Sequence, residues 1–264
     1  MCIIFAAVNK FADLRADEFK ARYASGYRGP QTSTTTVALT TTTSLPTTVD
    51  WVSQGAVTPV KNQEQCGASW AFSTTGAVEG ITFLATSVLP VLSEQQLIDC
   101  SGTQGNDGCY SGVTNYGFQY IIDNSGITSE AQYAYIAAES VCDTDVSSVA
   151  SITGFNAVPT YSDSDLMAAI AQQPVSVAIE TDEAGFQFYD SGVLTGTCGT
   201  QVDHNALAVG YGTSSTNYDY YKIKNSWGTD WGATGYILIG RGSSYDIAGQ
   251  CGILTAASYP VKST

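Results

Sequence analysis

The hydrophobic pattern changes along the chain from a helical to a strand-like repeat, and this change indicates the α+β class. In residues 69–85 the apolar side chains recur at helical spacing, which predicts a buried helix that begins at Ser69. A second helix is predicted over 93–100, where Ser93 is a typical N-cap and Gln96 follows three residues later. Segments rich in β-branched and aromatic residues predict four later strands, over 175–180, 204–211, 218–224 and 236–240.

The N-terminal part of the chain has a different character. Residues 9–24 predict a short extended piece followed by a helix, with Asp17 and Glu18 in its first turn and Gly26 as its stop. A threonine-rich tract then covers 32–48. Such a tract cannot form a core alone, so it predicts an exposed, extended linker.

Length and charge exclude some partners. The 264 residues allow one large domain or two lobes that share an interface. A net charge of −14 argues against binding to nucleic acid or to an anionic membrane, because both need a basic face. The apolar runs are also too short for a membrane span. The acidity fits an acidic compartment and plain solubility equally well.

Seven unevenly spaced cysteines favour disulfides and an oxidising compartment. Spacings typical of zinc sites are absent and there is one histidine, so we expect no metal and no cofactor. Six cysteines could form three bonds in any of fifteen pairings, which leaves one over. The start MCIIFAA is too short and lacks the basic residues of a signal peptide, so export is inferred from the cysteines alone.

Three sequence blocks carry the chemistry. They are PVKNQEQCGASWAFS at 59–73, VDHNALAVGYG at 202–212 and KNSWGTDWG at 224–232. In this order and at this spacing they resemble the active-site motifs of the papain family of cysteine proteases, and of cathepsin L in particular. Further blocks, LSEQQLIDC, GCYSG and CGILTAASYP, extend the resemblance over about residues 7–262.

The resemblance implies a role for each residue of the site. Ser69 takes the nucleophile position, His204 acts as acid and base, and Asn225 orients the imidazole. Gln63 completes the oxyanion hole with the backbone N–H of residue 69. Trp227 shields the His204–Asn225 pair. The reaction implied is peptide-bond hydrolysis through an acyl-enzyme.

Ser69 departs from the family, which has cysteine at this position. A hydroxyl is far less acidic than a thiol, so no thiolate–imidazolium pair can form and we expect little or no turnover. The serine could have been introduced to stop self-digestion, or it could be natural. A natural serine leaves two alternatives: a pseudoprotease that binds peptides, and a protein similar to the silicateins, in which a Ser-His-Asn site condenses silica. Asp203 is interpreted as a turn or rim residue without a direct catalytic role.

Smaller departures concern the cleft and the N-terminal segment. Glu64 replaces the usual glycine beside Gln63, and Ser111 replaces the first of two paired glycines, whereas Gly112 is kept. VNKFADL at 8–14 resembles the core of the family's pro-segment, without the upstream helical motif. The resemblance therefore implies that residues 1–44 would be a truncated pro-segment with its linker. Its stretch at about 25–44 would run backwards through the cleft, with a weak grip.

The same resemblance implies the disulfides and the substrate contacts. The disulfides would join Cys66 to Cys109, Cys100 to Cys142, and Cys198 to Cys251, with Cys2 free or intermolecular. The residues that contact substrate would be Gly112, Val113, Thr114, Ala178, Val202, Ala256 and Trp227. The small or apolar members form the main pocket, S2. Burial of a Leu, Phe or Val side chain there would contribute about 1.5–3 kcal/mol.

The expected molecule is an α+β papain-like fold with two lobes and a cleft between them. The peptidase domain would cover 45–264, with a helical lobe at about 50–155 and a β-barrel-like lobe at about 156–258. Its partners would be peptide or protein substrates, its own pro-segment and protein inhibitors. We expect a monomer in a lysosomal or vacuolar compartment or outside the cell.

Overall fold

The computed structural model describes residues 3–24, 26–29, 44–196 and 198–263. Cys2 and most of the predicted threonine-rich linker lie outside these ranges. The helices are α1 (Ala16–Tyr23), α2 (Ser69–Thr86), α3 (Glu94–Cys100), η1 (Ser101–Gln104), α4 (Thr114–Asp123), α5 (Asp163–Ile170), α6 (Ala184–Gln187) and η2 (Gln250–Gly252). None of them combines the length and the apolar character that crossing a membrane requires, within the residues described.

Nine described strands form one mixed sheet. They are β1 (Ile3–Ala6), β2 (Val49–Asp50), β3 (Gly154–Ala157), β4 (Val175–Ile179), β5 (Tyr189–Leu194), β6 (His204–Thr213), β7 (Asp219–Lys224), β8 (Tyr236–Gly240) and β9 (Ala257–Val261). The order is β1-β5-β8-β7-β6-β4-β9-β3, and β2 pairs with β6. β5 and β8 are parallel, whereas the other pairs are antiparallel. The α+β class is confirmed.

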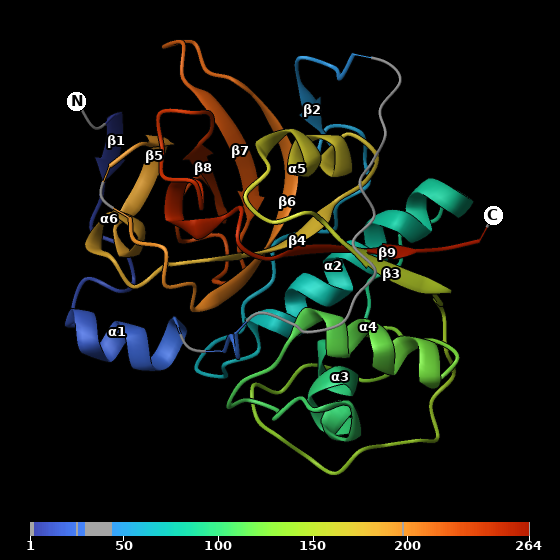
Figure 1. Ribbon diagram of the computed structural model, residues 1–264. Helices are drawn as coiled ribbons and strands as arrows, with labels where there is room; N and C mark the ends of the chain where they lie inside the picture. The colour runs from blue at the N-terminus through green and yellow to red at the C-terminus, as the bar shows by residue number, and fades with distance from the viewer. Residues whose placement is uncertain (1–2, 25, 30–43, 197, 264) are drawn as a thin grey trace.

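Helix α2 lies at the centre of the molecule, between the sheet and helices α3 and α4 (Figure 1). It is buried around most of its circumference and begins at Ser69, as predicted. It ends at Ser87, whose left-handed conformation (φ 61°) lets its N–H bond to the carbonyl of Phe83. In α3 the predicted cap is confirmed, because the Ser93 hydroxyl accepts a 3.0 Å hydrogen bond from the N–H of Gln96.

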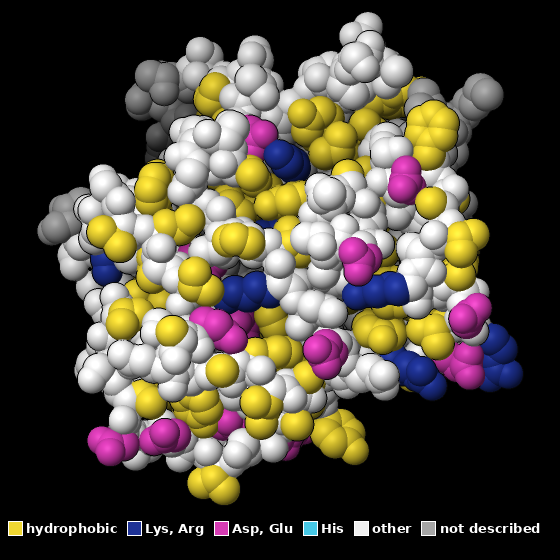
Figure 2. Space-filling model, turned by 180° about the vertical axis from the view of Figure 1, so that it is seen from behind, with side chains coloured by type: hydrophobic (Ala, Val, Ile, Leu, Met, Phe, Trp, Pro, Cys, Tyr) yellow, Lys and Arg dark blue, Asp and Glu magenta, His cyan; other side chains and the backbone are white. Residues whose placement is uncertain are grey.

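The buried side chains form two hydrophobic clusters. One surrounds α2 and the helices beside it, with Trp70, Leu97, Phe118 and Ile121 among its members. The other lies under the sheet, with Tyr221, Ile237 and the two tryptophans Trp227 and Trp231. Phe11 and Phe19 belong to this second cluster, so the N-terminal segment shares its core. On the rear face, acidic side chains are scattered among neutral and apolar ones (Figure 2).

Candidate active site

Ser69 lies at the first turn of α2 and is completely buried. The turn before it is held by the N–H of Gly67, which donates to the carbonyl of Cys109 (2.8 Å). The Ser69 hydroxyl oxygen accepts a 3.2 Å hydrogen bond from the N–H of Asn205. Residue 69 thus contacts β6 directly after His204, and its side chain lies at a helix N-terminus, where the helix dipole favours negative charge.

His204 and Asn225 are brought together by the pairing of β6 with β7. His204 is the first residue of β6, and Asn225 directly follows β7. The imidazole Nε2 donates to the side-chain oxygen of Asn225 at 2.8 Å, and the N–H of Ser226 donates to the same oxygen, also at 2.8 Å. Among the described residues, His204 Nδ1 has no hydrogen-bond partner. This nitrogen is therefore available for proton transfer.

Burial lowers the pKa of His204 to about 4. The hydrogen bond to Asn225 and the nearby main chain of Tyr23 oppose this shift, because both favour the protonated ring. With serine at position 69 there is no thiolate to stabilise the imidazolium. The imidazole is consequently neutral in the structure at neutral pH.

Gln63 and Trp227 lie close to this pair. Gln63 is fully buried; its side-chain oxygen accepts from the Ser226 hydroxyl (2.6 Å), and its side-chain nitrogen donates to the carbonyl of Cys66 (3.0 Å). The ring of Trp227 lies 5.0 Å from the imidazole, between centroids. The indole excludes water from the His204–Asn225 bond on that side.

The N-terminal segment passes directly over residue 69. Gly26 accepts a 2.9 Å hydrogen bond from the N–H of Gly112, and Tyr27 forms a parallel bridge with the same residue. A side chain at Gly26, whose φ is +146°, would meet the carbonyl oxygen of Gly67 at 2.7 Å and the Ser69 hydroxyl at 3.2 Å. Sequence reasoning assigned Gly26 only the end of a helix and missed this close approach.

Three of the predicted pocket residues surround one cavity of about 90 Å³. Val113, Thr114 and Ala256 line it, and Tyr27 of the N-terminal segment borders it. The structure does not bring Ala178 and Val202 to this lining. The N–H of Ala178, on β4, instead donates to the carbonyl of Ala256 (2.8 Å). Sequence reasoning also missed several polar members of the lining, which are Asn115, Thr160, Ser176, Asn205, Thr255 and Ser258.

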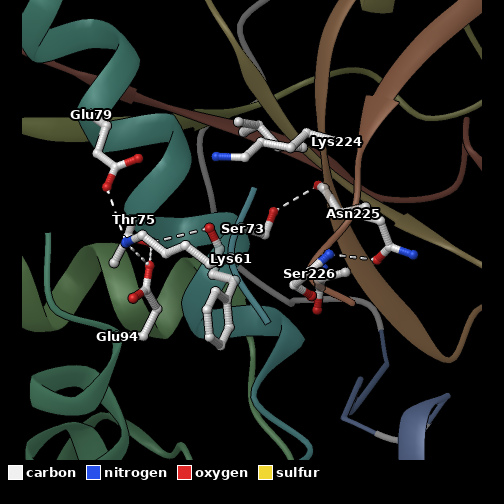
Figure 3. Close-up of a pocket in the computed structure, with 12 residues that line it drawn as sticks. Lys61, Ser73, Thr75, Glu79, Glu94, Lys224, Asn225 and Ser226 are labelled. Carbon is white, nitrogen blue, oxygen red and sulfur yellow. Dashed lines mark hydrogen bonds and ion pairs between the residues drawn. The ribbon is translucent and has the colours of Figure 1, made fainter. Parts of the chain in front are cut away.

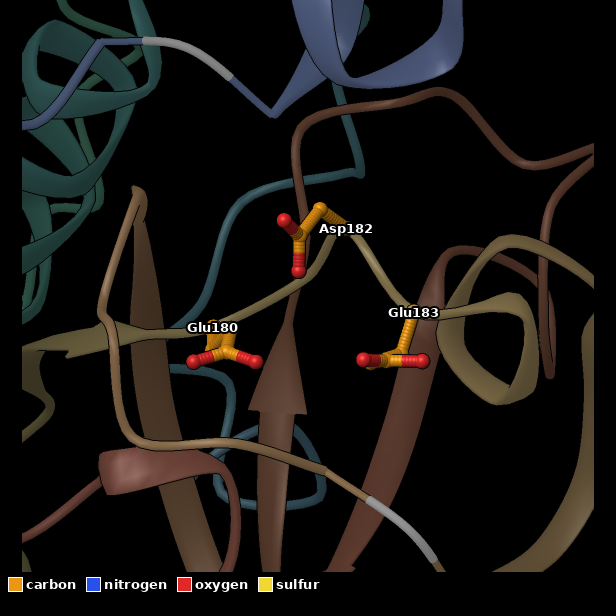
Figure 4. A group of neighbouring side chains, drawn as sticks. All are labelled: Glu180, Asp182 and Glu183. Atoms are coloured by element: carbon orange, nitrogen blue, oxygen red, sulfur yellow. The ribbon is translucent and has the colours of Figure 1, made fainter. Parts of the chain in front are cut away.

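Acidic side chains gather after β4, where Glu180, Asp182 and Glu183 lie close together (Figure 4). Two of them have protein partners. Asp182 forms an ion pair with Lys20 of α1, and Glu180 accepts from the N–H of Gln201. The nearby Asp203 uses Oδ1 to accept from the N–H (2.9 Å) and the hydroxyl (3.1 Å) of Thr181. Burial raises the pKa of Asp203 to about 7.

Three disulfides cross-link the chain. They join Cys66 to Cys109, Cys100 to Cys142, and Cys198 to Cys251, which is the pairing that the resemblance implies. The first is adjacent to Gly67 and so stabilises the turn before residue 69. Disulfides of this kind are typical of vacuolar or secreted proteins, whose compartments are oxidising.

Comparison with known proteins agrees with this geometry. A sequence profile described as "Papain family cysteine protease" matches residues 45–261. The chain is 46% identical to the cysteine endopeptidase RepA of Oryza sativa subsp. japonica, over 97% of this chain and 71% of that protein. It is 45% identical to vignain of Ricinus communis, over 97% of this chain and 73% of that protein.

Solved structures show the same fold. The recombinant stem bromelain precursor superimposes with a TM-score of 0.90 at 40% identity, over 99% of this chain and 84% of that one. Digestive procathepsin L 3 of Tenebrio molitor larval midgut gives a TM-score of 0.87 at 40% identity, over 98% and 83% of the two chains. The chain belongs to the papain family of cysteine proteases, and it has the papain-like fold.

Proposed function

We propose that this chain is a proenzyme of a cathepsin L-like endopeptidase in which serine at the nucleophile position stops catalysis. The proposal rests on the buried Asn225–His204 hydrogen bond beside the start of α2, with imidazole Nδ1 left without a hydrogen-bond partner among the described residues. Residues 1–44 act as the pro-segment and 45–264 as the peptidase domain, divided into lobes at about residue 155. The three disulfides support a vacuolar, lysosomal or secreted localisation, because these bonds persist in oxidising compartments.

With cysteine at position 69, each group has a defined step. The thiolate attacks the peptide carbonyl, and the oxyanion that forms is stabilised by the N–H of residue 69 and the side-chain amide of Gln63. His204 gives a proton to the departing amine as the C–N bond breaks, which leaves a thioester. A water molecule then gives its proton to His204 and attacks the thioester, which releases the acid and restores the thiolate. Asn225 holds the ring in the tautomer that these transfers need.

With serine the first step fails. The Ser69 hydroxyl stays protonated, because a hydroxyl is far less acidic than a thiol. Burial also lowers the pKa of His204 to about 4, which makes the imidazole a weak base for this proton. The hydroxyl oxygen also accepts from the N–H of Asn205. The unmodified chain therefore binds its pro-segment without cutting it.

The Ser69→Cys variant tests this proposal. After processing at acid pH, it should hydrolyse peptide amides with Leu or Phe at the second position before the cut, about a thousandfold or more faster than the unmodified chain. Ser69→Cys combined with His204→Ala is the matched control and should be inactive. A Ser69→Cys protein that folds, loses residues 1–44 and still cleaves no peptide would contradict the proposal.

Peptide binding without cleavage is a second candidate function of the unmodified chain. It is favoured by the hydrogen bond from the N–H of Gly112 to the carbonyl of Gly26, a contact that a substrate backbone could replace. Calorimetry with a peptide that contains Leu or Phe should detect binding once the pro-segment has been removed. Gly112→Ala should abolish it, because the added methyl group would meet the Trp70 ring at 2.4 Å.

A further inference from the structure

Four ionisable side chains meet in the interior where the segment before Gln63, helix α2 and the end of β7 come together (Figure 3). They line a cavity of about 20 Å³ and are Lys61, Glu79, Glu94 and Lys224. Lys61 Nζ lies 2.7 Å from Glu94 Oε1 and 3.4 Å from Glu79 Oε1. The two carboxylates are each only 1% exposed. Charges at such depth are retained only where each finds partners.

Lys224 reaches this cluster through a hydroxyl group. Its Nζ donates to Thr58 Oγ1 at 3.0 Å, and this is its hydrogen bond among the described residues. Thr58 Oγ1 in turn donates to Glu79 Oε2 at 2.6 Å. A hydroxyl can accept from an ammonium and donate to a carboxylate at the same time, whereas a methyl group can do neither. Thr58 is 1% exposed, so water does not replace it.

One end of this link is adjacent to a catalytic position, and the other lies on the helix that carries residue 69. Lys224 is the last residue of β7, and Asn225 follows it with its side-chain oxygen on the imidazole. Glu79 lies on α2, the helix that begins at residue 69. Figure 3 shows Lys224 extending from the strand toward this helix, on the same side as Glu79.

We propose that Thr58 is a positioning residue whose hydroxyl ties Lys224, and with it Asn225, to Glu79 on the helix that begins at residue 69. The inference rests on the proposed role of Asn225. Burial lowers the pKa of Lys224 to about 8, so at pH 6 its ammonium is charged and needs an acceptor. Without the Thr58 hydroxyl, the Lys224 ammonium would have to move to reach another hydrogen-bond acceptor. The end of β7, which carries Lys224, would move with it.

The unmodified chain allows a test that needs no activity, because its single histidine gives one set of imidazole ¹⁵N signals. At pH 6, Thr58→Val should shift these signals, and Thr58→Ser should restore them. Thr82→Val is the matched control, since Thr82 is also buried but its hydroxyl has no partner among the described residues. Signals of Thr58→Val that coincide with those of Thr82→Val would overturn the proposal.

Lys224→Met removes the ammonium that donates to the Thr58 hydroxyl. This variant tests the positioning role of Thr58 even if Thr58→Val does not fold. It should shift the imidazole signals, and the double variant should match Lys224→Met alone, because both changes break one link. The proposal would be contradicted if Lys224→Met left the imidazole signals unshifted. It would also be contradicted if the shifts of Thr58→Val and Lys224→Met added up in the double variant.

Kinetics in the Ser69→Cys background give an independent measure. Thr58→Val should lower kcat about tenfold with KM changed less than about twofold, because misplacement of the imidazole affects the chemical step more than binding. A kcat equal to that of Thr82→Val would overturn the proposal. If Ser69→Cys itself is inactive, the proposed function fails, whereas the imidazole signals of the unmodified chain still decide the role of Thr58.

Discussion

Backbone conformations that favour glycine govern the approach to residue 69. Gly26 lets the N-terminal segment pass over the Ser69 hydroxyl at a distance that any larger residue would prevent. Directly after Gln63, Glu64 adopts φ +53°, a left-handed conformation. The resemblance to the papain family predicts glycine at this position, and the φ angle supplies the physical reason. The chain thus keeps a strained residue beside the oxyanion position.

Glu64→Gly should raise the free energy of unfolding by about 1 kcal/mol, because glycine adopts this conformation without the steric cost of a Cβ atom. Urea denaturation of the unmodified and variant chains measures the difference. Glu64→Gln is the control, since it removes the charge and keeps the strained backbone, and its stability should stay unchanged. Equal gains from the two substitutions would assign the effect to charge and contradict the backbone argument.

Residues within the motif blocks could be located from the sequence. The bond between His204 and Asn225 follows from two blocks that the resemblance identifies as partners. The close approach of Gly26 and the hydroxyl link at Thr58 were not predicted. Both contacts depend on residues that are far away in the chain. The local sequence around Gly26 and Thr58 does not show which distant residues they will meet.

At the scale of elements, the N-terminal helix α1 is docked through buried aromatic rings. The weak grip that we expected concerns the stretch at about 25–44, most of which lies outside the described residues. In the structure, the Phe19 ring is fully buried and lies 5.2 Å from the Trp227 ring, and Phe11 lies 5.5 Å from it. Lys20 adds the ion pair with Asp182. Aromatic rings that are buried this completely contribute several kcal/mol.

Phe19→Ala should release the N-terminal segment, because loss of a buried Phe side chain costs about 3 kcal/mol or more. Limited trypsin digestion of the unmodified chain should then cut within residues 10–28 at least about tenfold faster, since cleavage follows the population of the undocked form. Phe5→Ala is the matched control, because Phe5 is 67% exposed. Equal digestion rates for Phe19→Ala and the unmodified chain would show that α1 is held by other contacts.

The elements that could be predicted are those with strong local signals. Helix α2 and the strands β4, β6, β7 and β8 lie where periodicity and β-rich composition indicate, with ends that differ by one or two residues. β3, β5 and β9 were not predicted. β5 contains Asp, Ser and Gly, and it becomes a strand because β1 and β8 pair with it on either side. Long-range pairing of this kind leaves little trace in the local sequence.

At the scale of the whole molecule, three groups in the interior should dominate the pH dependence of stability between pH 7 and 5. The pKa of Asp203 and that of Glu94 are raised to about 7, in both cases mainly by burial. The two carboxyl groups therefore penalise the folded state above pH 7, and this penalty falls as the pH drops toward their unfolded values near 4. Burial of His204 acts in the opposite direction, because its pKa is lowered to about 4 and the unfolded imidazole gains a proton below pH 6.5.

Near pH 6 the folded chain holds protons on both carboxyl groups, whereas the unfolded chain holds one on the imidazole. The folded state therefore binds about one proton more, and the free energy of unfolding should rise by about 1 kcal/mol per pH unit as the pH falls from 7 to 5. Urea denaturation at half-unit intervals measures this slope. Asp203→Asn removes one of the two protons and should bring the slope close to zero. If the free energy of unfolding fell from pH 7 to 5, the pKa shift of His204 would have a larger effect on stability than those of Asp203 and Glu94 together. The imidazole would then be more strongly desolvated than the two carboxyl groups.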